Sequence, residues 1–368
     1  MNQQRLQRLT SAILENGLDG IVLMPGPNLL YLSGIHVHVS ERPILLFVPA
    51  DDDPAIIIPT LEAQKARQAG LAEERIFDWS DDEGYTGAFQ RACAYLELSD
   101  YLLGVEALHM RVLEMELLHR YAPGLSTAHA EPIMGALRLA KDKDEVATMQ
   151  RAVNIAEQAL AALVPRIEVG QSEKQIAAML SQALTEAGSQ GNAFGPIVQA
   201  GPNGASPHGV PTDRPIQEGD LMVIDFGAIV DDYPSDITRT FAVGDVSPEL
   251  RRVHDIVRQA NEAGRAAALP GATGRDIDRA ARGVIDNAGY GDRFIHRTGH
   301  GLGLEVHEPP YIMEGNVEPL APGAVFTVEP GIYLPDKAGV RIEDNVVITG
   351  DGARTLTSFS RELITVGQ

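Results

Sequence analysis

Two β-hairpins predicted in the C-terminal half of the chain each carry two acidic residues, and this arrangement limits how that half can fold. In the first hairpin, strand 221–230 meets strand 236–243 around the Asp-Asp-Tyr-Pro turn of residues 231–234. If the chain reverses just before the first residue of this turn, Asp225 lies opposite Asp236, with Cβ atoms ~5 Å apart. Both carboxylates would then share one face of one sheet.

The second predicted hairpin joins strand 324–334 with strand 339–349 through residues 335–338. Centring this turn on its second residue puts Glu329 opposite Glu343. A register shift of two residues would make either acidic pair diagonal neighbours, still within reach of one ion. A shift of one residue would put the two partners on opposite faces of the sheet.

Carboxylates that face each other on half-buried strands repel, so without a cation the pKa of at least one of them would rise. Four carboxylates and the imidazole of His300 are too many ligands for one small ion. They suit two hard divalent cations ~3.5 to 4 Å apart that share bridging carboxylates. Oxygen-rich ligation with a single histidine favours Mn²⁺ over a structural zinc site, which would prefer Cys, and leaves Co²⁺ and Zn²⁺ as alternatives.

Each of these residues also has a simpler interpretation. Asp225 and Asp236 taken alone could be acids on a solvated hairpin face, and a lone histidine is more often structural than a ligand. His300 is favoured as a ligand because glycines on both sides of it permit close backbone approach. Glu329 follows the run Val-Phe-Thr-Val, where a bare carboxylate would be costly to bury.

Short motifs surround these residues, and together they resemble one family. They are Ile-Asp-Phe-Gly (224–227), Ser-Asp-Ile-Thr-Arg-Thr (235–240), His-Arg-Thr-Gly-His-Gly-Leu-Gly-Leu-Glu-Val-His-Glu-Pro (296–309), Val-Glu-Pro-Gly-Ile-Tyr (328–333) and Val-Arg-Ile-Glu-Asp (340–344). The set resembles the pita-bread metallopeptidases, and within them the Xaa-Pro dipeptidases (prolidases) and Xaa-Pro aminopeptidases. Residues 27–34 resemble, more weakly, the small N-terminal domain of creatinase and prolidase relatives.

The resemblance implies a role for each matching metal position. Asp225 would bind one ion, His300 and Glu329 the other, and Asp236 and Glu343 would bridge the two. Two cations lower the pKa of a water between them, and the family pattern implies that this water attacks the scissile carbonyl. Glu329 is then both a ligand and the catalytic acceptor of the water's proton.

The family pattern also implies residues that contact the substrate. His208 and His307 match catalytic histidines that hold substrate and stabilise charge near the tetrahedral intermediate. His296 matches a further substrate-binding histidine, and Arg341 matches the arginine beside the last metal ligand. Arg341 could instead form a structural ion pair with Glu343.

One position departs from the pattern of many prolidases. These enzymes carry an arginine four residues after the position of His307, where it can hold the free carboxylate of a dipeptide, whereas this chain has Tyr311. We expect a basic residue elsewhere to replace that arginine. Arg42, in the polar loop 40–43, is the candidate, because in a homodimer this loop could reach the active site of the partner.

The length of 368 residues predicts two or three domains. Residues 1–135 alternate helical patterns with short apolar strands at residues 20–24, 44–49 and 55–59, which is typical of a small α/β domain. The resemblance implies that this part is a creatinase/prolidase-like domain.

Residues 136–368 are expected to form the pita-bread catalytic domain, so the whole chain falls in the α/β (α+β) class. Its start is marked by the charged run 141–145, which interrupts the preceding pattern. We predict helices for residues 144–163 and 173–187, followed by strands and turns to the end of the chain.

Composition narrows the possible partners. The formal charge of −21 and pI near 4.8 argue against nucleic acid, whose phosphates attract Lys and Arg. No apolar run approaches the ~18 residues of a membrane helix, so no membrane partner is expected. Cys93 is the only cysteine, which excludes an internal disulfide and favours the cytoplasm.

The resemblance implies metal-dependent hydrolysis of Xaa-Pro peptide bonds, with small peptides that carry proline in the second position as substrates. Dipeptides are the first expectation, and trimming of longer peptides by an Xaa-Pro aminopeptidase is the alternative. Another reaction at the same metal site also stays open. A non-peptidase binding protein on this scaffold would show at least one broken metal position, whereas all five positions are intact.

Overall fold

The computed structural model describes residues 1–367, and their backbone divides into two compact units, Met1–Arg138 and Leu139–Gln368. Helix α6 (Glu131–Leu139) contains this division and also the boundary expected after residue 135. Each unit has its own hydrophobic core.

A six-stranded mixed sheet forms the centre of the N-terminal unit, in the order β4-β3-β2-β1-β5-β6. Its strands are β1 (Gly20–Leu23), β2 (Leu45–Pro49), β3 (Ala55–Pro59), β4 (Ile76–Trp79), β5 (Leu102–Val105) and β6 (Ser126–His129). Every residue of β1, β2 and β3 is buried, which explains why these strands read as continuous apolar runs. They are the three strands that the sequence predicts.

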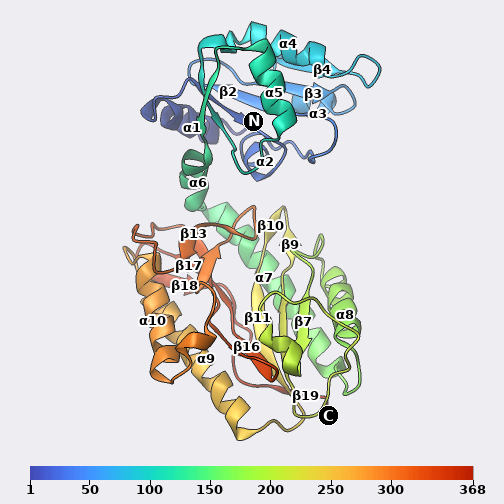
Figure 1. The fold of residues 1–368 in the computed structure, drawn as a ribbon, viewed down its shortest axis with the longest axis vertical. Helices are drawn as coiled ribbons and strands as arrows, with labels where there is room; N and C mark the ends of the chain where they lie inside the picture. Colours follow the sequence, from blue (N-terminus) through green and yellow to red (C-terminus); the bar gives the residue numbers. More distant parts are fainter. Residues whose placement is uncertain (368) are drawn as a thin grey trace. The chain divides into compact units, whose positions relative to one another are not determined.

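Helices cover this sheet (Figure 1). They are α1 (Gln3–Glu15), α2 (Pro27–Ser33), α3 (Ala63–Gln68), α4 (Thr86–Tyr95), α5 (Val112–Tyr121) and α6, with single 3-10 turns η1 (Glu73–Arg75) and η2 (Leu98–Asp100). Phe89 of α4 and Leu117 of α5 share a core with Phe47 of β2. The apolar faces of α4 and α5 therefore stabilise the unit by packing on the sheet.

Two larger sheets build the C-terminal unit, in the orders β19-β11-β8-β7 and β13-β12-β14-β17-β18, and two hairpins, β9-β10 and β15-β16, extend them. The strands are β7 (Ile197–Ala200), β8 (Leu221–Phe226), β9 (Ile229–Val230), β10 (Tyr233–Pro234), β11 (Ile237–Val243), β12 (Gly299–Gly301), β13 (Glu308–Ile312), β14 (Val325–Val328), β15 (Gly331–Leu334), β16 (Ala338–Arg341), β17 (Asp344–Ile348), β18 (Ala353–Thr355) and β19 (Thr365–Val366).

Four long helices flank these strands: α7 (Lys143–Leu163), α8 (Glu173–Glu186), α9 (Pro248–Ala267) and α10 (Gly274–Asn287). Short turns η3 (Val164–Arg166), η4 (Gly201–Ala205) and η5 (Gly291–Arg293) complete the unit. Helix α7 begins within the charged run 141–145, because Asp142 caps the helix and forms a reciprocal capping box with Glu145.

Helices α9 and α10 contradict the expectation of only strands and turns after residue 187. Ser247 caps α9 with Pro248 in its first turn, and Thr273 forms a capping box with Asp276 at the start of α10. In Figure 1 the pair α9–α10 and the pair α7–α8 lie on opposite sides of the strands. The strands that carry the acidic residues are thus held between two helical layers.

The first hairpin differs from its predicted register. Asp225 lies opposite Thr238, so the prediction that Asp225 faces Asp236 is wrong. The chain reverses through a two-residue turn at Asp231 and Asp232, both with positive φ, which is the backbone of a tight type I′ hairpin. This turn lies one residue later than expected and shifts the register by two, which keeps both acids on one face.

The second hairpin has the predicted register. Val328 pairs with Asp344 and Gly331 pairs with Arg341, which places Glu329 opposite Glu343 in an interruption between the two strand pairs. Because the ladder is interrupted, the backbone N–H groups of both glutamates are free to bond elsewhere. That of Glu329 donates to Thr298 O (2.8 Å) and that of Glu343 to Thr238 O (3.1 Å).

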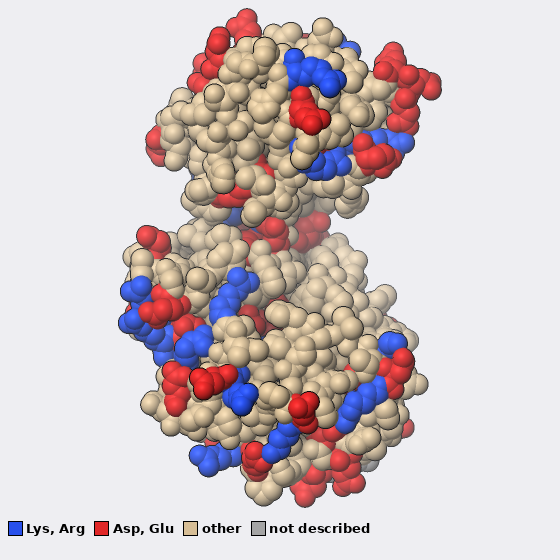
Figure 2. All heavy atoms as spheres, in the orientation of Figure 1, with Lys and Arg blue, Asp and Glu red and all other residues tan. Residues whose placement is uncertain are grey.

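Charged side chains on the face of the molecule drawn in Figure 2 are mixed in sign, with Lys and Arg beside Asp and Glu. Arg279 and Glu314 form an exposed ion pair, at 2.6 Å. Of the helices in residues 1–367, none has both the length and the apolar composition to cross a bilayer.

Candidate active site

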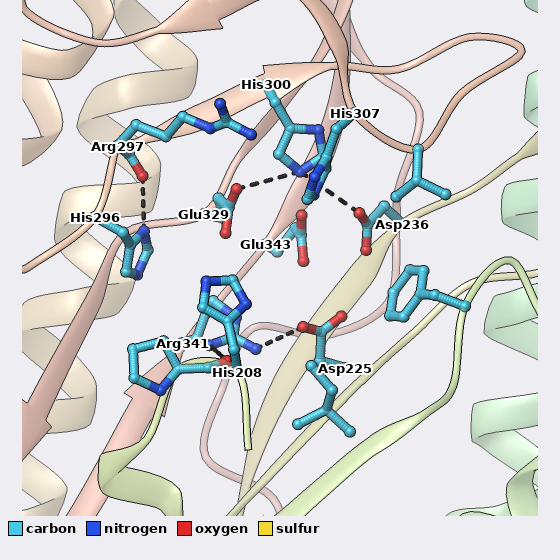
Figure 3. A pocket seen from close by; sticks show the side chains of 14 residues that line it. His208, Asp225, Asp236, His296, Arg297, His300, His307, Glu329, Arg341 and Glu343 are labelled. Atoms are coloured by element: carbon cyan, nitrogen blue, oxygen red, sulfur yellow. Dashed lines mark hydrogen bonds and ion pairs between the residues drawn. The ribbon is translucent and has the colours of Figure 1, made fainter. Parts of the chain in front are cut away.

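A pocket of about 680 Å³ opens in the C-terminal unit (Figure 3). All the predicted site residues except Arg42 line it: His208, Asp225, Asp236, His296, His300, His307, Glu329, Arg341 and Glu343. Arg42 belongs to the N-terminal unit, where its half-exposed guanidinium pairs with Asp81 at 2.8 Å. Its reach into a partner's site stays a prediction.

The topology brings the five predicted ligands together from separate elements. They are Asp225 in β8, Asp236 just before β11, His300 at the centre of β12, Glu329 just after β14, and Glu343 between β16 and β17. Asp225 is 8% exposed and Asp236 is 4% exposed, so the interpretation of these two as acids on a solvated face is wrong.

The ligand atoms lie close enough to share a cation. His300 Nε2 is 3.7 Å from Asp236 Oδ2 and 3.4 Å from Glu329 Oε1. Asp236, His300 and Glu343 each offer a ligand atom within 4.8 Å of the others. These three residues come from three different strand regions, so tertiary folding alone creates the group.

Two of the pocket carboxylates have an oxygen without a hydrogen-bond partner. Within residues 1–367, Asp225 Oδ1 and Asp236 Oδ1 are buried without a hydrogen-bond partner. Burial, and then the charges of neighbouring carboxylates, raise the pKa of Asp236 and Glu343 well above the ordinary range. Burial raises the pKa of Glu329 to about 8. Divalent cations would satisfy these oxygens and cancel the repulsion, so the residues fit such ions.

His300 is oriented as a metal ligand. Its Nδ1 lies 3.1 Å from Gly301 O, and because a carbonyl only accepts, Nδ1 carries the proton. Burial first, and then the neighbouring His307, lower the pKa of His300 to about 3, which leaves Nε2 unprotonated. The Nε2 lone pair therefore faces the carboxylates, as a coordinating imidazole requires.

The glycines beside His300 are needed because neighbouring backbone comes very close. A Cβ added at Gly299 would lie 1.9 Å from Thr327 O, and one at Gly301 would lie 2.2 Å from Pro309 O. Any larger residue would push β14 or β13 away from β12. The glycines therefore fix the position from which His300 enters the pocket.

Arg341 supports the acidic group through a chain of hydrogen bonds. It donates to Asp225 Oδ2 (2.5 Å) and to the Tyr333 hydroxyl (2.8 Å), which in turn lies 2.8 Å from His296 Nε2. Since arginine only donates, the Tyr333 oxygen accepts and its hydrogen points to His296. The alternative that Arg341 forms an ion pair with Glu343 is therefore wrong, because the carboxylate that Arg341 pairs with is that of Asp225.

The same chain fixes the state of His296. With Nε2 accepting from Tyr333, Nδ1 must donate to Arg297 O, 2.7 Å away. Burial lowers the pKa of His296 to about 4, which agrees with this neutral form. Both ring nitrogens are engaged, so contact of His296 with a substrate would use the face of the ring.

His307 and His208 are the two pocket histidines with the most freedom. His307 is an exposed residue, and its ring centroid lies 4.0 Å from that of His300. His208 is exposed, in the loop after η4. The buried Glu173 fixes this loop from both sides, because it accepts from Asn203 Nδ2 in η4 (3.0 Å) and from Thr212 Oγ1 after His208 (2.7 Å).

Sequence reasoning missed two residues: Glu173, which anchors the His208 loop, and Arg297, which lines the pocket. Nothing in the pattern of helix 173–187 indicates that its first acid anchors the His208 loop. Arg297 lines the pocket, with its guanidinium carbon 4.4 Å from the centroid of the Tyr311 ring. Its place directly after His296 was the available signal.

Comparisons with known proteins identify the family of this chain. Residues 147–350 match the model of metallopeptidase family M24, and residues 5–140 match the creatinase/prolidase N-terminal domain. The prolidase of Thermococcus sibiricus superposes with a TM-score of 0.94 at 35% identity, covering 100% of this chain and 99% of that one.

Two further relatives bear on the activity. The Xaa-Pro dipeptidase of Pyrococcus furiosus is 34% identical over 98% of this chain and 100% of its own. An X-Pro aminopeptidase of Thermotoga maritima superposes with a TM-score of 0.86 at 32% identity, covering 98% of this chain and 99% of that one. The family implies divalent metal ions, and the buried carboxylates fit them. The chain therefore belongs to metallopeptidase family M24 and carries a creatinase/prolidase N-terminal domain.

Proposed function

We propose that the protein is a metal-dependent dipeptidase that hydrolyses the bond before proline in Xaa-Pro dipeptides. The observation that supports this most strongly is the convergence of all five predicted ligands in one pocket that leaves buried carboxylate oxygens without protein partners. The similarity to Xaa-Pro dipeptidases over nearly the whole chain supports the choice of substrate.

Two divalent cations, with Mn²⁺ the first candidate, are proposed for the acidic group. Asp225 would hold one, His300 and Glu329 the other, and Asp236 and Glu343 would serve both. When bound, such cations lower the pKa of water and polarise a carbonyl. The preponderance of oxygen ligands favours a hard ion.

The remaining steps fall to side chains of this chain. Glu329 is proposed to accept the proton of the attacking water, because its carboxylate lies in the pocket beside His300 (3.4 Å). His307 and His208 are proposed to donate to the oxygen of the scissile carbonyl as charge develops there. Burial lowers the pKa of His307, which leaves a neutral ring that can still donate one N–H.

The bond before proline suits this pocket for a chemical reason. It is a tertiary amide without an N–H, so an enzyme that holds substrates through their backbone N–H groups loses a contact. Histidines that contact the carbonyl do not need that donor. The face of the His296 ring is proposed to contact the proline ring of the substrate. Arg341 is proposed to hold Asp225 in place.

A cytoplasmic homodimer is proposed as the working form. The single cysteine, Cys93, is buried, and burial raises the pKa of its thiol to about 11, so it is suited to a reducing compartment. A dimer would give the Arg42 loop access to a neighbouring site. Sedimentation at micromolar concentration tests this, and a monomer would exclude any role of Arg42 across subunits.

An Xaa-Pro aminopeptidase is the second candidate. Tyr311 in place of the arginine of many prolidases favours it, as does the similarity to the Thermotoga maritima enzyme. The two candidates differ in whether a free carboxylate directly after proline is required.

Metal-stripped protein reloaded with Mn²⁺ should release proline from Ala-Pro and cleave Ala-Ala far more slowly. Asp236→Asn, which keeps the size of the side chain, should remove the activity. Equal cleavage of both dipeptides would contradict the proposed specificity, and full activity in a chelator would contradict the role of the metal.

A further inference from the structure

We infer that Arg297, stacked on Tyr311, holds the free carboxylate of the dipeptide and so sets the length of substrate that the pocket accepts. This inference rests on the proposed Xaa-Pro dipeptidase function. Arg297 would then bind the carboxylate in place of the arginine that many prolidases carry where this chain has Tyr311.

A dipeptide carries a terminal carboxylate directly after proline, and the pocket must provide a cation for it. Four of the residues that line the pocket are carboxylates, which repel a fifth. A substrate carboxylate taken from water without a charged partner would be strongly disfavoured. The task therefore falls to a pocket residue with a positive charge and unused donors.

Arg341 is one of two arginines in the pocket, but its donors are engaged. Its guanidinium makes four hydrogen bonds, to Thr238 Oγ1, Pro207 O, the Tyr333 hydroxyl and Asp225 Oδ2. It is also 3% exposed. Turning it toward a substrate would leave Asp225 as a buried carboxylate without its counter-charge.

Arg297 is the other arginine, and its donors are available. Within residues 1–367 its guanidinium forms no hydrogen bond or ion pair with another side chain; its contact is the ring of Tyr311, at 4.4 Å. Stacking uses the face of the guanidinium and leaves the N–H groups at its edge free, in the fork that matches a carboxylate. Figure 3 shows this group extending into the pocket toward Glu329 and His300.

The position of Tyr311 explains how an arginine can be supplied from another strand. Thr298 N donates to Ile312 O at 2.9 Å, which holds the two antiparallel segments together next to Arg297 and Tyr311, and the Arg297 guanidinium reaches across to the Tyr311 ring. The ring at position 311 does not bind the carboxylate itself. It serves as a platform that holds the guanidinium of Arg297 where it reaches the pocket.

Substrate length follows from this geometry. An added third residue moves the terminal carboxylate by one residue, about 3.5 Å. Arg297 then meets a neutral peptide carbonyl in place of a charge, and the charge-assisted bond is weakened. A preference for dipeptides is the expected consequence.

The test compares Ala-Pro with Ala-Pro-amide, which differ only in the charge of the terminal group. Wild type should prefer Ala-Pro, and Arg297→Gln should lower its kcat/KM for Ala-Pro about 10- to 100-fold while changing that for the amide much less. Arg297→Lys should restore part of the preference, because it keeps the charge without the fork. Arg279→Gln, at an exposed surface arginine, is the matched control and should keep the wild-type ratio.

Inhibition by the product tests the same preference for a free carboxylate without measuring turnover of a dipeptide analogue. Proline should inhibit wild type more strongly than prolinamide, and Arg297→Gln should abolish this difference. Tyr311→Ala should reduce the preference for Ala-Pro in part, because the guanidinium loses its platform.

Several results would overturn the inference. An equal loss for acid and amide would make Arg297 merely structural, and a loss confined to Glu-Pro would mean that it recognises the side chain of the first residue. Loss of the preference in Arg42→Gln, with Arg297→Gln unaffected, would assign the task to Arg42. If wild type cleaves neither substrate, the proposed function itself fails; if wild type cleaves Ala-Pro and Arg297→Gln keeps the preference, the inference alone fails.

Discussion

Arg341 Nη2 lies 2.5 Å from Asp225 Oδ2, and both residues are buried. The arginine thus supplies a fixed positive charge next to an acidic group that is otherwise short of counter-charges. Its second bond, to Tyr333, couples the same guanidinium to His296. One side chain therefore orients a candidate ligand and a candidate substrate-side histidine together.

Replacing Arg341 with Met should weaken metal binding about 10- to 100-fold, because the change leaves Asp225 without the partner that orients it. Loss of one partner of a buried pair also destabilises a fold, typically by about 3 to 5 kcal/mol. Calorimetric Mn²⁺ titration measures the first effect and urea unfolding the second. Arg279→Met, which breaks an exposed pair, is the control, and wild-type affinity in Arg341→Met would contradict the role of this arginine.

Without metal, the protein should lose stability as pH rises from about 5 to 8. Burial raises the pKa of Asp236, Glu329 and Glu343 in the fold, to about 8 for Glu329. The folded state then holds protons that the unfolded chain releases near pH 4, so this stabilisation is full at low pH and disappears as pH rises through the folded pKa.

The comparison that checks this is urea unfolding at pH 5.5 and pH 8, in a chelator and in Mn²⁺. Bound cations remove the repulsion between the carboxylates, so the metal-loaded protein should depend less on pH over this range. The same pH dependence with and without metal would show that these acids do not form the cation site.

Gly301→Ala and Gly283→Ala should have opposite effects on stability. A Cβ at Gly301 would meet the Pro309 carbonyl at 2.2 Å, so β12 and β13 must separate beside His300. Gly283 lies inside α10 with nothing near its added Cβ, and alanine there should stabilise by roughly 0.5 to 1 kcal/mol through helix propensity. Thermal unfolding measures both, and a neutral Gly301→Ala would contradict the close packing around His300.

The sequence was most informative where motifs and turns act locally. The register of the second hairpin follows from the short turn around Asp336, whose positive φ allows a tight reversal. The register of the first hairpin was harder to predict, because Asp231 and Asp232 alone make the turn and Pro234 already lies in β10. Proline usually marks a turn, but it can stand in a short strand that lacks a partner on one side.

Helices α9 and α10 were missed because their polar faces are rich in charge. In α9, Leu250, Val253 and Val257 recur at helical spacing on the buried side, and this signal was available. The contact between Arg297 and Tyr311 could not be predicted. It depends on the register shift between β12 and β13, which is set by tertiary packing.

The most direct test of the account is proline release from Ala-Pro, compared with cleavage of Ala-Pro-Ala, by metal-stripped protein before and after reloading with Mn²⁺. We predict no cleavage before reloading and, after it, rapid cleavage of Ala-Pro with the tripeptide much slower. Preference for the tripeptide would assign the protein to the aminopeptidases, and no cleavage of either peptide in Mn²⁺ would contradict the proposed peptidase function.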